Sequence, residues 1–309
     1  MIQAKSVIKK YEDHRVLGPI NVKVKEGEII YLLGESGSGK STLLNILAGL
    51  EDADEGFVRV NDKKITGPSH NLVPGYKNIS HVAQDFYLDP YLSVFESMAR
   101  KVPYLSQTAK LKTVKRILRV CGLSKRMDSR PEELSGGEQQ RIALAAALIN
   151  EPDVVLLDEP FSNLDIPLKR KLRYDIIEII KGEGVTAVVV SHDSYEAMAV
   201  ADRIMILRKG KMVQMSAPVD LYENPRSIYA ASFLGEINKI ILNDDSLLIR
   251  PKNFKIRNDG AHEGVVTQCI YQGDNYHIHI TSEISESPIL IFHHTKITPG
   301  NSLRFNIKA

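Results

Sequence analysis

A glycine-rich segment early in the chain has the composition of a phosphate-binding loop. Residues 34–41 have the sequence GESGSGKS and fit the pattern G-x-x-x-x-G-K-[ST]. They follow an apolar run at 28–33 and open a helix pattern at 40–48, which is the setting that this motif needs. Glycines let the backbone turn tightly, so that N–H groups and the helix start face phosphate oxygens. A chance glycine- and serine-rich turn is the alternative.

Two side chains of this segment have specific expected tasks. Lys40 would bridge the β- and γ-phosphates of a nucleotide, and the hydroxyl of Ser41 would bind Mg²⁺. The expected nucleotide-binding residues of the segment are Gly34, Glu35, Ser36, Gly37, Ser38, Gly39, Lys40, Ser41 and Thr42.

Two acidic residues follow another apolar run. Residues 154–157 have the sequence VVLL, and Asp158 and Glu159 come directly after them. Asp158 would hold Mg²⁺, and Glu159 would polarise the attacking water as a general base. A carboxylate pair that caps the next turn is the alternative, but the phosphate-loop pattern in the same chain favours the catalytic interpretation.

A second helix start of the anion-binding type lies at residues 134–141, with the sequence LSGGEQQR. Ser135, Gly136 and Gly137 precede a helix of small and apolar residues, so their N–H groups could face phosphate oxygens. One nucleotide does not need two such helix starts from one chain. We therefore expect a composite site, in which these three residues bind the γ-phosphate held by another copy. A glycine turn between two helices is the alternative.

In this order the segments resemble the ATP-binding subunits of ABC transporters. Residues 34–41 resemble the Walker A motif, 154–159 the Walker B motif and 134–141 the signature motif. The resemblance implies that ATP and Mg²⁺ are the cofactors. It also implies ATP hydrolysis by a P-loop NTPase with a RecA-like core.

The resemblance implies roles for further residues. Gln84 is similar to the Q-loop glutamine, which contacts Mg²⁺ or the lytic water, and His192 is similar to the switch histidine, which contacts the γ-phosphate. Residues 162–165 resemble the D-loop at the dimer seam, although Asp165 could equally cap the following helix. Tyr11 stands where the family carries an aromatic residue that stacks on adenine, and an ordinary strand tyrosine is the alternative.

The elements around these motifs predict an α/β fold. Apolar runs without alternation at 28–33, 154–157, 185–190 and 204–207 are typical of strands buried on both faces of a parallel sheet. Residues 168–180 show the spacing of an amphipathic helix. The segment of about 89–150 has helical patterns and no comparable strand run, so it predicts a helical subdomain within an ATPase domain of residues 1–235.

The last part of the chain predicts a small all-β domain at 236–309. Short alternating runs are separated by turn residues there, at 247–249, 265–270, 277–280 and 289–292. Its histidines His277, His279, His293 and His294 suggest a metal site. No acidic or cysteine partner stands at close ligand spacing, so solvated or edge-strand histidines are the expectation.

The resemblance to importer ATPases of the maltose, spermidine/putrescine and ferric-iron type extends into this domain. Residues 249–251, with the sequence IRP, lie where those proteins carry an Arg-Pro-Glu segment, which implies an OB-like (TOBE) domain. Lys252 departs from the expected glutamate. Further departures are Ala83, Asp89 and Ala146, and those near 83–90 lie where the family meets its membrane subunit. The transported solute is therefore left open.

Composition narrows the function classes. Lys and Arg total 40 and Asp and Glu total 38, so a net charge of +2 argues against a nucleic-acid partner. Two cysteines without a paired motif fit a reducing cytoplasm. No apolar run approaches the roughly 18 residues that cross a bilayer, and the first residues lack the apolar stretch of a signal peptide. Any action at a membrane would need a partner.

The resemblance therefore implies an ATPase that forms a head-to-tail homodimer on ATP and powers solute import. Its partners would be transmembrane permease subunits and a periplasmic or lipid-anchored solute-binding protein, and its place the cytoplasmic face of the inner membrane. A soluble ABC ATPase for translation, repair or cluster assembly is the alternative. A single cassette without coiled coils or zinc modules argues against it. The OB-like tail likewise argues against an exporter.

Overall fold

The computed structural model describes residues 1–12, 14–71, 74–83, 88–161 and 166–308. Contacts within the chain divide it into two compact units, Met1–Val219 and Asp220–Ala309. The expected boundary at 235/236 between separable domains stays a prediction. Within the described ranges, no helix combines the length and the apolar character needed to cross a membrane.

A six-stranded sheet forms the centre of the first unit, in the order β10-β9-β3-β8-β7-β6. All neighbouring pairs are parallel except β10 with β9. The strands are β3 (Ile29–Leu33), β6 (Ile79–Val82), β7 (Val154–Asp158), β8 (Thr186–Val190), β9 (Arg203–Arg208) and β10 (Lys211–Ser216). Every residue of β3 and β8 is buried, because helices or a second sheet cover both faces. The α/β fold expected from the apolar runs is confirmed.

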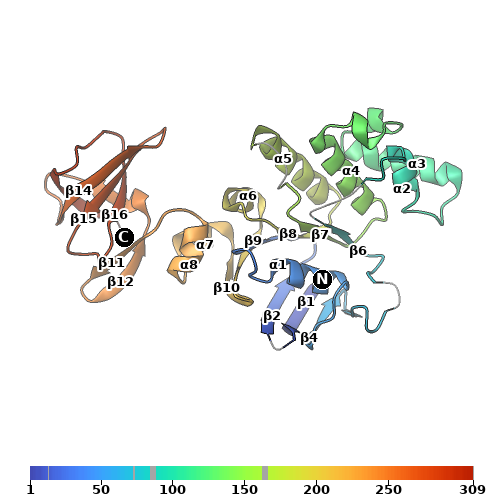
Figure 1. The fold of residues 1–309 in the computed structure, drawn as a ribbon, viewed down its shortest axis with the longest axis horizontal. Helices are drawn as coiled ribbons and strands as arrows, with labels where there is room; N and C mark the ends of the chain where they lie inside the picture. The colour runs from blue at the N-terminus through green and yellow to red at the C-terminus, as the bar shows by residue number, and fades with distance from the viewer. Residues whose placement is uncertain (13, 72–73, 84–87, 162–165, 309) are drawn as a thin grey trace. The chain divides into compact units, whose positions relative to one another are not determined.

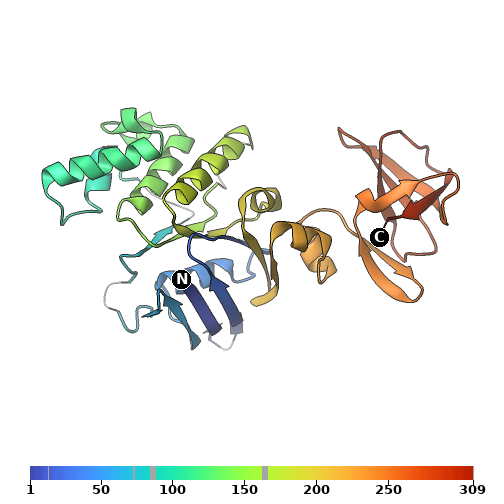
Figure 2. The same ribbon diagram turned by 180° about the vertical axis from the view of Figure 1, so that it is seen from behind.

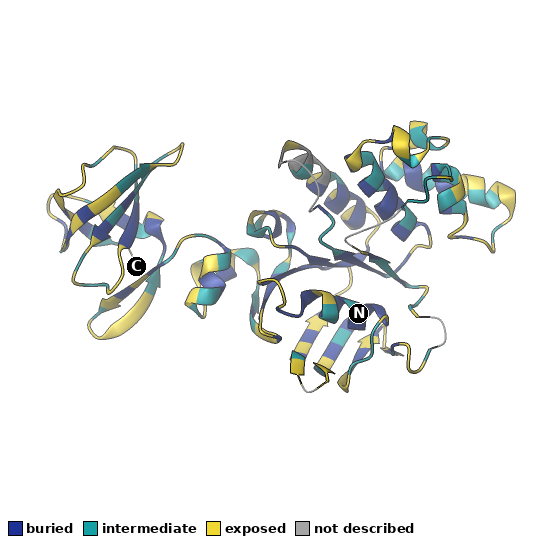
Figure 3. Cartoon of the chain, in the orientation of Figure 1, coloured by how far each residue is buried: buried dark blue, intermediate teal, exposed yellow. Residues whose placement is uncertain are grey.

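One face of this sheet is covered by α1 (Lys40–Ala48). Figure 1 shows α1 between the six-stranded sheet and a four-stranded antiparallel sheet, β2-β1-β4-β5. The latter strands are β1 (Ile2–Tyr11), β2 (His14–Val24), β4 (Glu55–Val60) and β5 (Lys63–Ile65). One apolar core joins the three layers, with Leu44 of α1, Ile20 of β2 and Leu156 of β7 among its members. The alternating bands along β2 in Figure 3 show that one face of this strand is buried and the other exposed.

The opposite face of the sheet carries helices, as Figure 2 shows from behind. They include α5 (Ile166–Gly182) and α6 (Ser194–Val200). The described part of 89–150 contains α2 (Val94–Ala99), α3 (Gln107–Val120), the short 3₁₀ helices η1 (Ser124–Arg126) and η2 (Pro131–Glu133), and α4 (Gly136–Leu148). Val114, Ile117 and Leu118 of α3 are fully buried, and α3 contacts α2, α4 and η1. The helical insertion expected within the RecA-like core is present.

The second unit contains an antiparallel five-stranded sheet in the order β13-β17-β14-β15-β16. Its strands are β13 (Phe254–Ile256), β14 (His262–Tyr271), β15 (Tyr276–Thr281), β16 (Ile289–His293) and β17 (Ser302–Ile307). A hairpin of β11 (Asn238–Leu242) and β12 (Asp245–Ile249) and the 3₁₀ helix η3 (Pro251–Asn253) accompany it. Phe254, Ile278 and Phe305 lie in its apolar core. The His277 ring stacks on Phe292 at 4.5 Å between ring centroids, and no cluster of three or more His, Cys, Asp or Glu side chains that could hold a metal ion occurs among the described residues.

Arg250 connects the β-rich part of this unit to its helices α7 (Pro218–Glu223) and α8 (Ile228–Phe233). It is only 2% exposed, and its guanidinium lies 4.1 Å from the centroid of the Tyr222 ring. It donates to main-chain carbonyls of Tyr222 (3.2 and 3.1 Å), Ala231 (3.1 Å), Gly235 (2.9 Å) and Glu236 (3.0 Å). These bonds explain why the second unit begins near residue 220, before the first strand of the β domain.

Candidate functional site

The carboxyl ends of three neighbouring parallel strands carry the candidate site. The phosphate-loop segment follows β3, Glu159 follows β7 and His192 follows β8, and these strands lie side by side in the order β3-β8-β7. Ligand sites of α/β sheets form at this edge. Ten residues line a cavity of about 470 Å³: Val16, Gly34, Ser36, Gly37, Gly39, Lys40, Ser41, Thr42, Glu159 and His192. The fold thus brings most of the expected nucleotide-binding residues together with two of the expected catalytic residues.

The backbone of the loop needs glycine at its last turn before α1. Gly39 has φ +97°, in the left-handed region, and is the N-cap of α1. A Cβ atom there would also lie 3.0 Å from Leu17 Cδ1 and 3.1 Å from the Val16 carbonyl oxygen. Another residue would therefore strain the turn and crowd the adjacent strand. Ser38 lies in the same turn, 3% exposed, and its Oγ has no hydrogen-bond partner among the described residues.

Lys40 points into the loop. Its Nζ donates to the carbonyl oxygens of Gly34 at 2.9 Å and Glu35 at 3.0 Å. Burial lowers the pKa of its amine, and the carboxylates of Glu159 and Asp158 act in the opposite direction. The ammonium is thus bound to neutral carbonyl oxygens, lies near two carboxylates and borders the cavity. This arrangement can compensate phosphate charge.

Glu159 and His192 form a pair across the site. The Nδ1 atom of His192 lies 3.3 Å from Oε2 of Glu159, and the side chains are 60% and 23% exposed, respectively. Glu159 has φ +45°, a left-handed conformation that is uncommon for a residue with a side chain. Its N–H donates to the Val190 carbonyl at 3.0 Å, which ties this turn to the end of β8. Such backbone strain is held in place by the surrounding structure and occurs often at functional sites.

The other expected residues of the site are placed as follows. Asp158 ends β7 and is close enough to Lys40 to influence its pKa. Tyr11 ends β1 and is 47% exposed. Its hydroxyl donates to Glu51, and partial burial together with this hydrogen bond raises the pKa of the hydroxyl. Gln84 and the D-loop residues 162–165 lie outside the described residues.

The signature residues Ser135, Gly136 and Gly137 do not line the cavity of the phosphate loop. Ser135 caps α4: its Oγ accepts from the N–H of Glu138 at 3.3 Å, and its own N–H donates to Glu138 Oε2 at 3.0 Å. Arg126 holds the other oxygen of the same carboxylate at 2.7 Å. Within one subunit, this helix start therefore does not complete the nucleotide site.

Some residues at the site were not expected from the sequence. Val16 of β2 lines the cavity, and no local pattern marks it. Tyr31, Ser191 and Glu196 form a buried hydrogen-bonded group behind His192. The sequence predicts only part of this arrangement: Asp193 and Glu196 have the spacing of an N-cap residue and the third residue of a helix, which marks the start of α6.

Comparison with known proteins agrees with this geometry. Residues 17–162 match the ABC transporter family, and residues 247–309 match the TOBE domain. The chain is 36% identical to the spermidine/putrescine import ATP-binding protein PotA of Clostridioides difficile (strain 630), over 96% of this chain and 92% of that protein. It is 31% identical to the protein of the same name from Acetivibrio thermocellus, over 99% of this chain and 94% of that protein.

Solved structures show the same fold. A dimeric post-hydrolysis state of the ATP-binding cassette MJ0796, bound to ADP and Pi, aligns with a TM-score of 0.61 and 31% identity, covering 71% of this chain and 99% of that cassette. The similarity to import proteins favours a transport ATPase over the soluble alternative. The chain belongs to the ATP-binding subunits of importer-type ABC transporters with a TOBE domain, which bind and hydrolyse ATP to drive solute import.

Proposed function

We propose that two copies of this chain close head-to-tail on two ATP molecules and that hydrolysis opens them again. The observation that supports this is the separation of two anion-binding helix starts within one subunit. The cavity contains Lys40, Glu159 and His192, whereas Ser135 at the start of α4 does not line it. A second copy would bring its Ser135, Gly136 and Gly137 to the γ-phosphate. Dimeric cassettes among the solved relatives are consistent with this arrangement.

In the proposed reaction, Lys40 and the N–H groups of the phosphate loop bind and orient the β- and γ-phosphates. Glu159 accepts a proton from the attacking water, and His192 orients Glu159 and contacts the γ-phosphate. These groups act by positioning and charge compensation, which dominate phosphoryl transfer. The rest of the cavity is lined by Val16, Gly34, Ser36, Gly37, Gly39, Ser41 and Thr42.

The oxygen-rich donor set fits Mg²⁺. Ser41, which lines the cavity, carries a hydroxyl, and Asp158 carries a carboxylate at the end of β7. Such hard oxygen ligands suit this ion. Ser41, Asp158 and Gln84 would hold it. When bound, Mg²⁺ neutralises charge on the phosphate oxygens.

The side chain of Tyr11 would stack on adenine.

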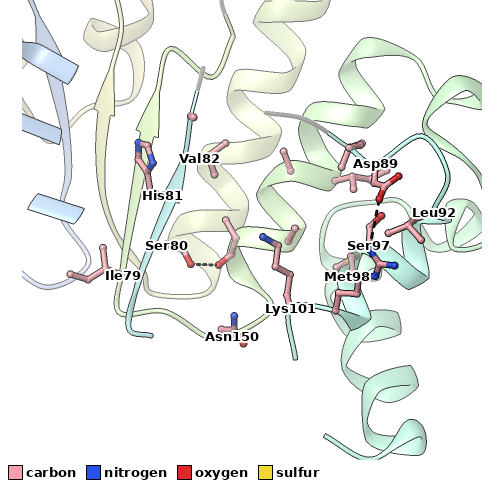
Figure 4. A pocket seen from close by; sticks show the side chains of 17 residues that line it. Ile79, Ser80, His81, Val82, Asp89, Leu92, Ser97, Met98, Lys101 and Asn150 are labelled. Carbon is pink, nitrogen blue, oxygen red and sulfur yellow. Dashed lines mark hydrogen bonds and ion pairs between the residues drawn. The ribbon is translucent and has the colours of Figure 1, made fainter. Parts of the chain in front are cut away.

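We propose that a permease subunit docks in a groove between β6 and the helical segment. The groove has a volume of about 750 Å³. Figure 4 shows His81 and Ser80 of β6 on one side and Met98 and Lys101 on the other. Ser80 Oγ donates to the Ala147 carbonyl at 2.6 Å. The groove is lined by apolar side chains such as Leu92 and Met98 together with the polar Ser97 and Lys101, so it could accommodate a segment of mixed polarity.

A groove-filling substitution tests this docking. Ser97→Trp adds bulk inside the groove, and Thr108→Trp adds the same bulk to an exposed position of α3. We expect the first variant to lose at least about tenfold in affinity for purified permease subunits, equal to about 1.4 kcal/mol, with basal ATPase activity retained. Undiminished permease binding by Ser97→Trp would refute this location.

We further propose that the transported solute is a polyamine, because the relatives over the full chain are spermidine/putrescine import proteins. The protein would then act at the cytoplasmic face of the inner membrane, with a permease and a periplasmic or lipid-anchored solute-binding protein. Uptake of labelled putrescine, spermidine, maltose and ferric iron by cells with the wild-type chain and with Glu159→Gln tests the solute. Polyamine uptake that depends on Glu159 is the expected result, and dependence of maltose or iron uptake instead would refute it.

A further inference from the structure

A buried polar cluster lies behind the loop that carries His192, and the catalytic scheme above does not use it. Tyr31 of β3 is 0% exposed, and Glu196 of α6 is 1% exposed. The Tyr31 hydroxyl donates to Glu196 Oε1 at 2.9 Å. Burial raises the pKa of the Glu196 carboxyl and raises the pKa of the Tyr31 hydroxyl well above its usual value. These two side chains therefore depend on each other for hydrogen bonding in a desolvated position.

The cluster holds both neighbours of His192 in the chain. Ser191 Oγ donates to Glu196 Oε2 at 3.1 Å and accepts from the N–H of Asp193 at 3.0 Å. Asp193 Oδ1 in turn accepts from the N–H of Glu196 at 3.0 Å. The backbone on either side of His192 is therefore fixed to the first turn of α6.

Two more contacts fix this loop to β3 and to α5. The Ser191 N–H donates to the Leu32 carbonyl at 3.2 Å, in the strand that leads to the phosphate loop. Lys169 of α5 lies 3.2 Å from Asp193 Oδ2. As a result, the position of His192 is linked to β3 and to α5, and its Nδ1 reaches Glu159 Oε2 at 3.3 Å.

Helix capping does not account for the Glu196 carboxylate. The cap of α6 is provided by the Asp193 side chain and the Glu196 main-chain N–H, so any residue at 196 would supply that donor. The carboxylate itself contacts Tyr31 and Ser191. Burying a carboxylate costs more free energy than burying an apolar side chain of similar volume. The position would therefore be better filled by leucine if only packing mattered.

We propose that Glu196 and Tyr31 are positioning residues for ATP hydrolysis, which hold the loop so that His192 meets Glu159 and the γ-phosphate. This inference rests on the role of His192 in the proposed function. It predicts a loss in the catalytic step with ATP binding retained, because neither residue lines the nucleotide cavity.

The test uses the full-length chain with three substitutions. Glu196→Leu removes both bonds of the carboxylate, Tyr31→Phe removes one, and Glu196→Gln retains an acceptor for Tyr31. We expect kcat to fall about tenfold or more for Glu196→Leu, the fold-change that about 1.4 kcal/mol produces in a rate, less for Tyr31→Phe, and least for Glu196→Gln. KM for ATP should stay within about twofold. The exposed residues Glu178 and Tyr174 of α5 give the matched controls Glu178→Leu and Tyr174→Phe.

A His192→Ala background separates positioning from general destabilisation. If Glu196 acts through His192, Glu196→Leu should cause no further loss of kcat in that background, measured as phosphate release from labelled ATP. The proposal would be overturned if Glu196→Leu lowered kcat by the same factor with and without His192→Ala. It would also be overturned if Glu196→Leu alone had the kcat of the wild type while His192→Ala alone was impaired. Wild-type kcat of His192→Ala would instead refute the role of His192 and, with it, this inference. If Glu196→Leu does not fold, the pair Tyr31→Phe and Glu196→Gln gives the same comparison.

Discussion

The Nδ1 atom of His192 lies 3.3 Å from Oε2 of Glu159, across the carboxyl ends of two adjacent strands. This distance places a titratable ring against the carboxylate that we propose as the general base. Both residues line the same cavity as Lys40 of the phosphate loop. The chemistry of the chain is therefore concentrated at the end of three parallel strands.

Glu159→Gln should retain ATP binding and lose turnover. The amide keeps the shape of the side chain but accepts no proton, so kcat should fall by about 10²–10⁴, the range for loss of a general base. The variant should accumulate as an ATP-bound dimer, visible by size-exclusion chromatography with ATP. Turnover at the wild-type rate would remove Glu159 from the reaction.

Lys40→Ala should weaken ATP binding itself. Loss of one charge-assisted hydrogen bond of about 1.5–3 kcal/mol predicts an increase in Kd of about tenfold or more. Isothermal titration with Mg-ATP measures this, and Lys64→Ala at an exposed position of β5 is the control. An unchanged Kd would contradict the placement of the phosphates.

The same lysine predicts a pH dependence. Burial lowers the pKa of Lys40, so its ammonium loses its proton at a lower pH than that of an exposed lysine. Phosphate oxygens stabilise the charged form, so ATP affinity should fall as pH rises through the pKa of the nucleotide-free protein, and binding there should take up a proton. Titrations from neutral to alkaline pH in buffers of different ionisation enthalpy measure this uptake. Absence of proton uptake in wild type would contradict the prediction.

Tyr11→Ala should raise KM for ATP with little change in kcat. Stacking of a base on an aromatic ring contributes about 1–3 kcal/mol, and the Tyr11 side chain is 47% exposed and thus accessible. Tyr11→Phe keeps the ring and loses the hydroxyl with its hydrogen bonds to Glu51 and Thr42, so it should behave nearly as wild type if stacking is what binds adenine. Equal KM values for the alanine variant and wild type would show that adenine binds elsewhere.

Arg250 should be essential for the second unit but not for ATP hydrolysis. Arg250→Ala leaves main-chain carbonyls at Tyr222, Ala231 and Gly235 without their charged donor, so the unit should lose about 2 kcal/mol or more of unfolding free energy. Arg257→Ala at an exposed position is the control. Urea unfolding measures the loss of unfolding free energy.

Fragments 1–235 and 1–219 test whether the second unit is dispensable for ATP binding and hydrolysis. A folded 1–219 fragment that no longer binds ATP would contradict this division.

The predictable parts of the molecule are those with local signals. The strand, loop and helix from 28 to 48 could be inferred because an apolar run, a glycine pattern and a helical spacing follow one another. The outer sheet could not, because the pairing of β1 with β2 shifts register between Ala4 and Lys10, which interrupts the alternation that marks a strand. The bond between Tyr31 and Glu196 joins residues 165 positions apart, and the acceptors of Arg250 are main-chain carbonyls. Local spacing marks Glu196 only as a residue in the first turn of a helix, and it gives no sign of either set of contacts.

The mixing of two inactive variants tests the composite site most directly. Lys40→Ala damages the phosphate loop and Ser135→Arg damages the start of α4, so each homodimer has two damaged sites. In a head-to-tail heterodimer, both changes fall in one site and the other site is intact. The account predicts that verified heterodimers recover ATPase activity that neither parent shows. Heterodimers as inactive as both parents, together with no ATP-dependent cross-link between cysteines substituted for Ser38 and Gly136, would contradict it.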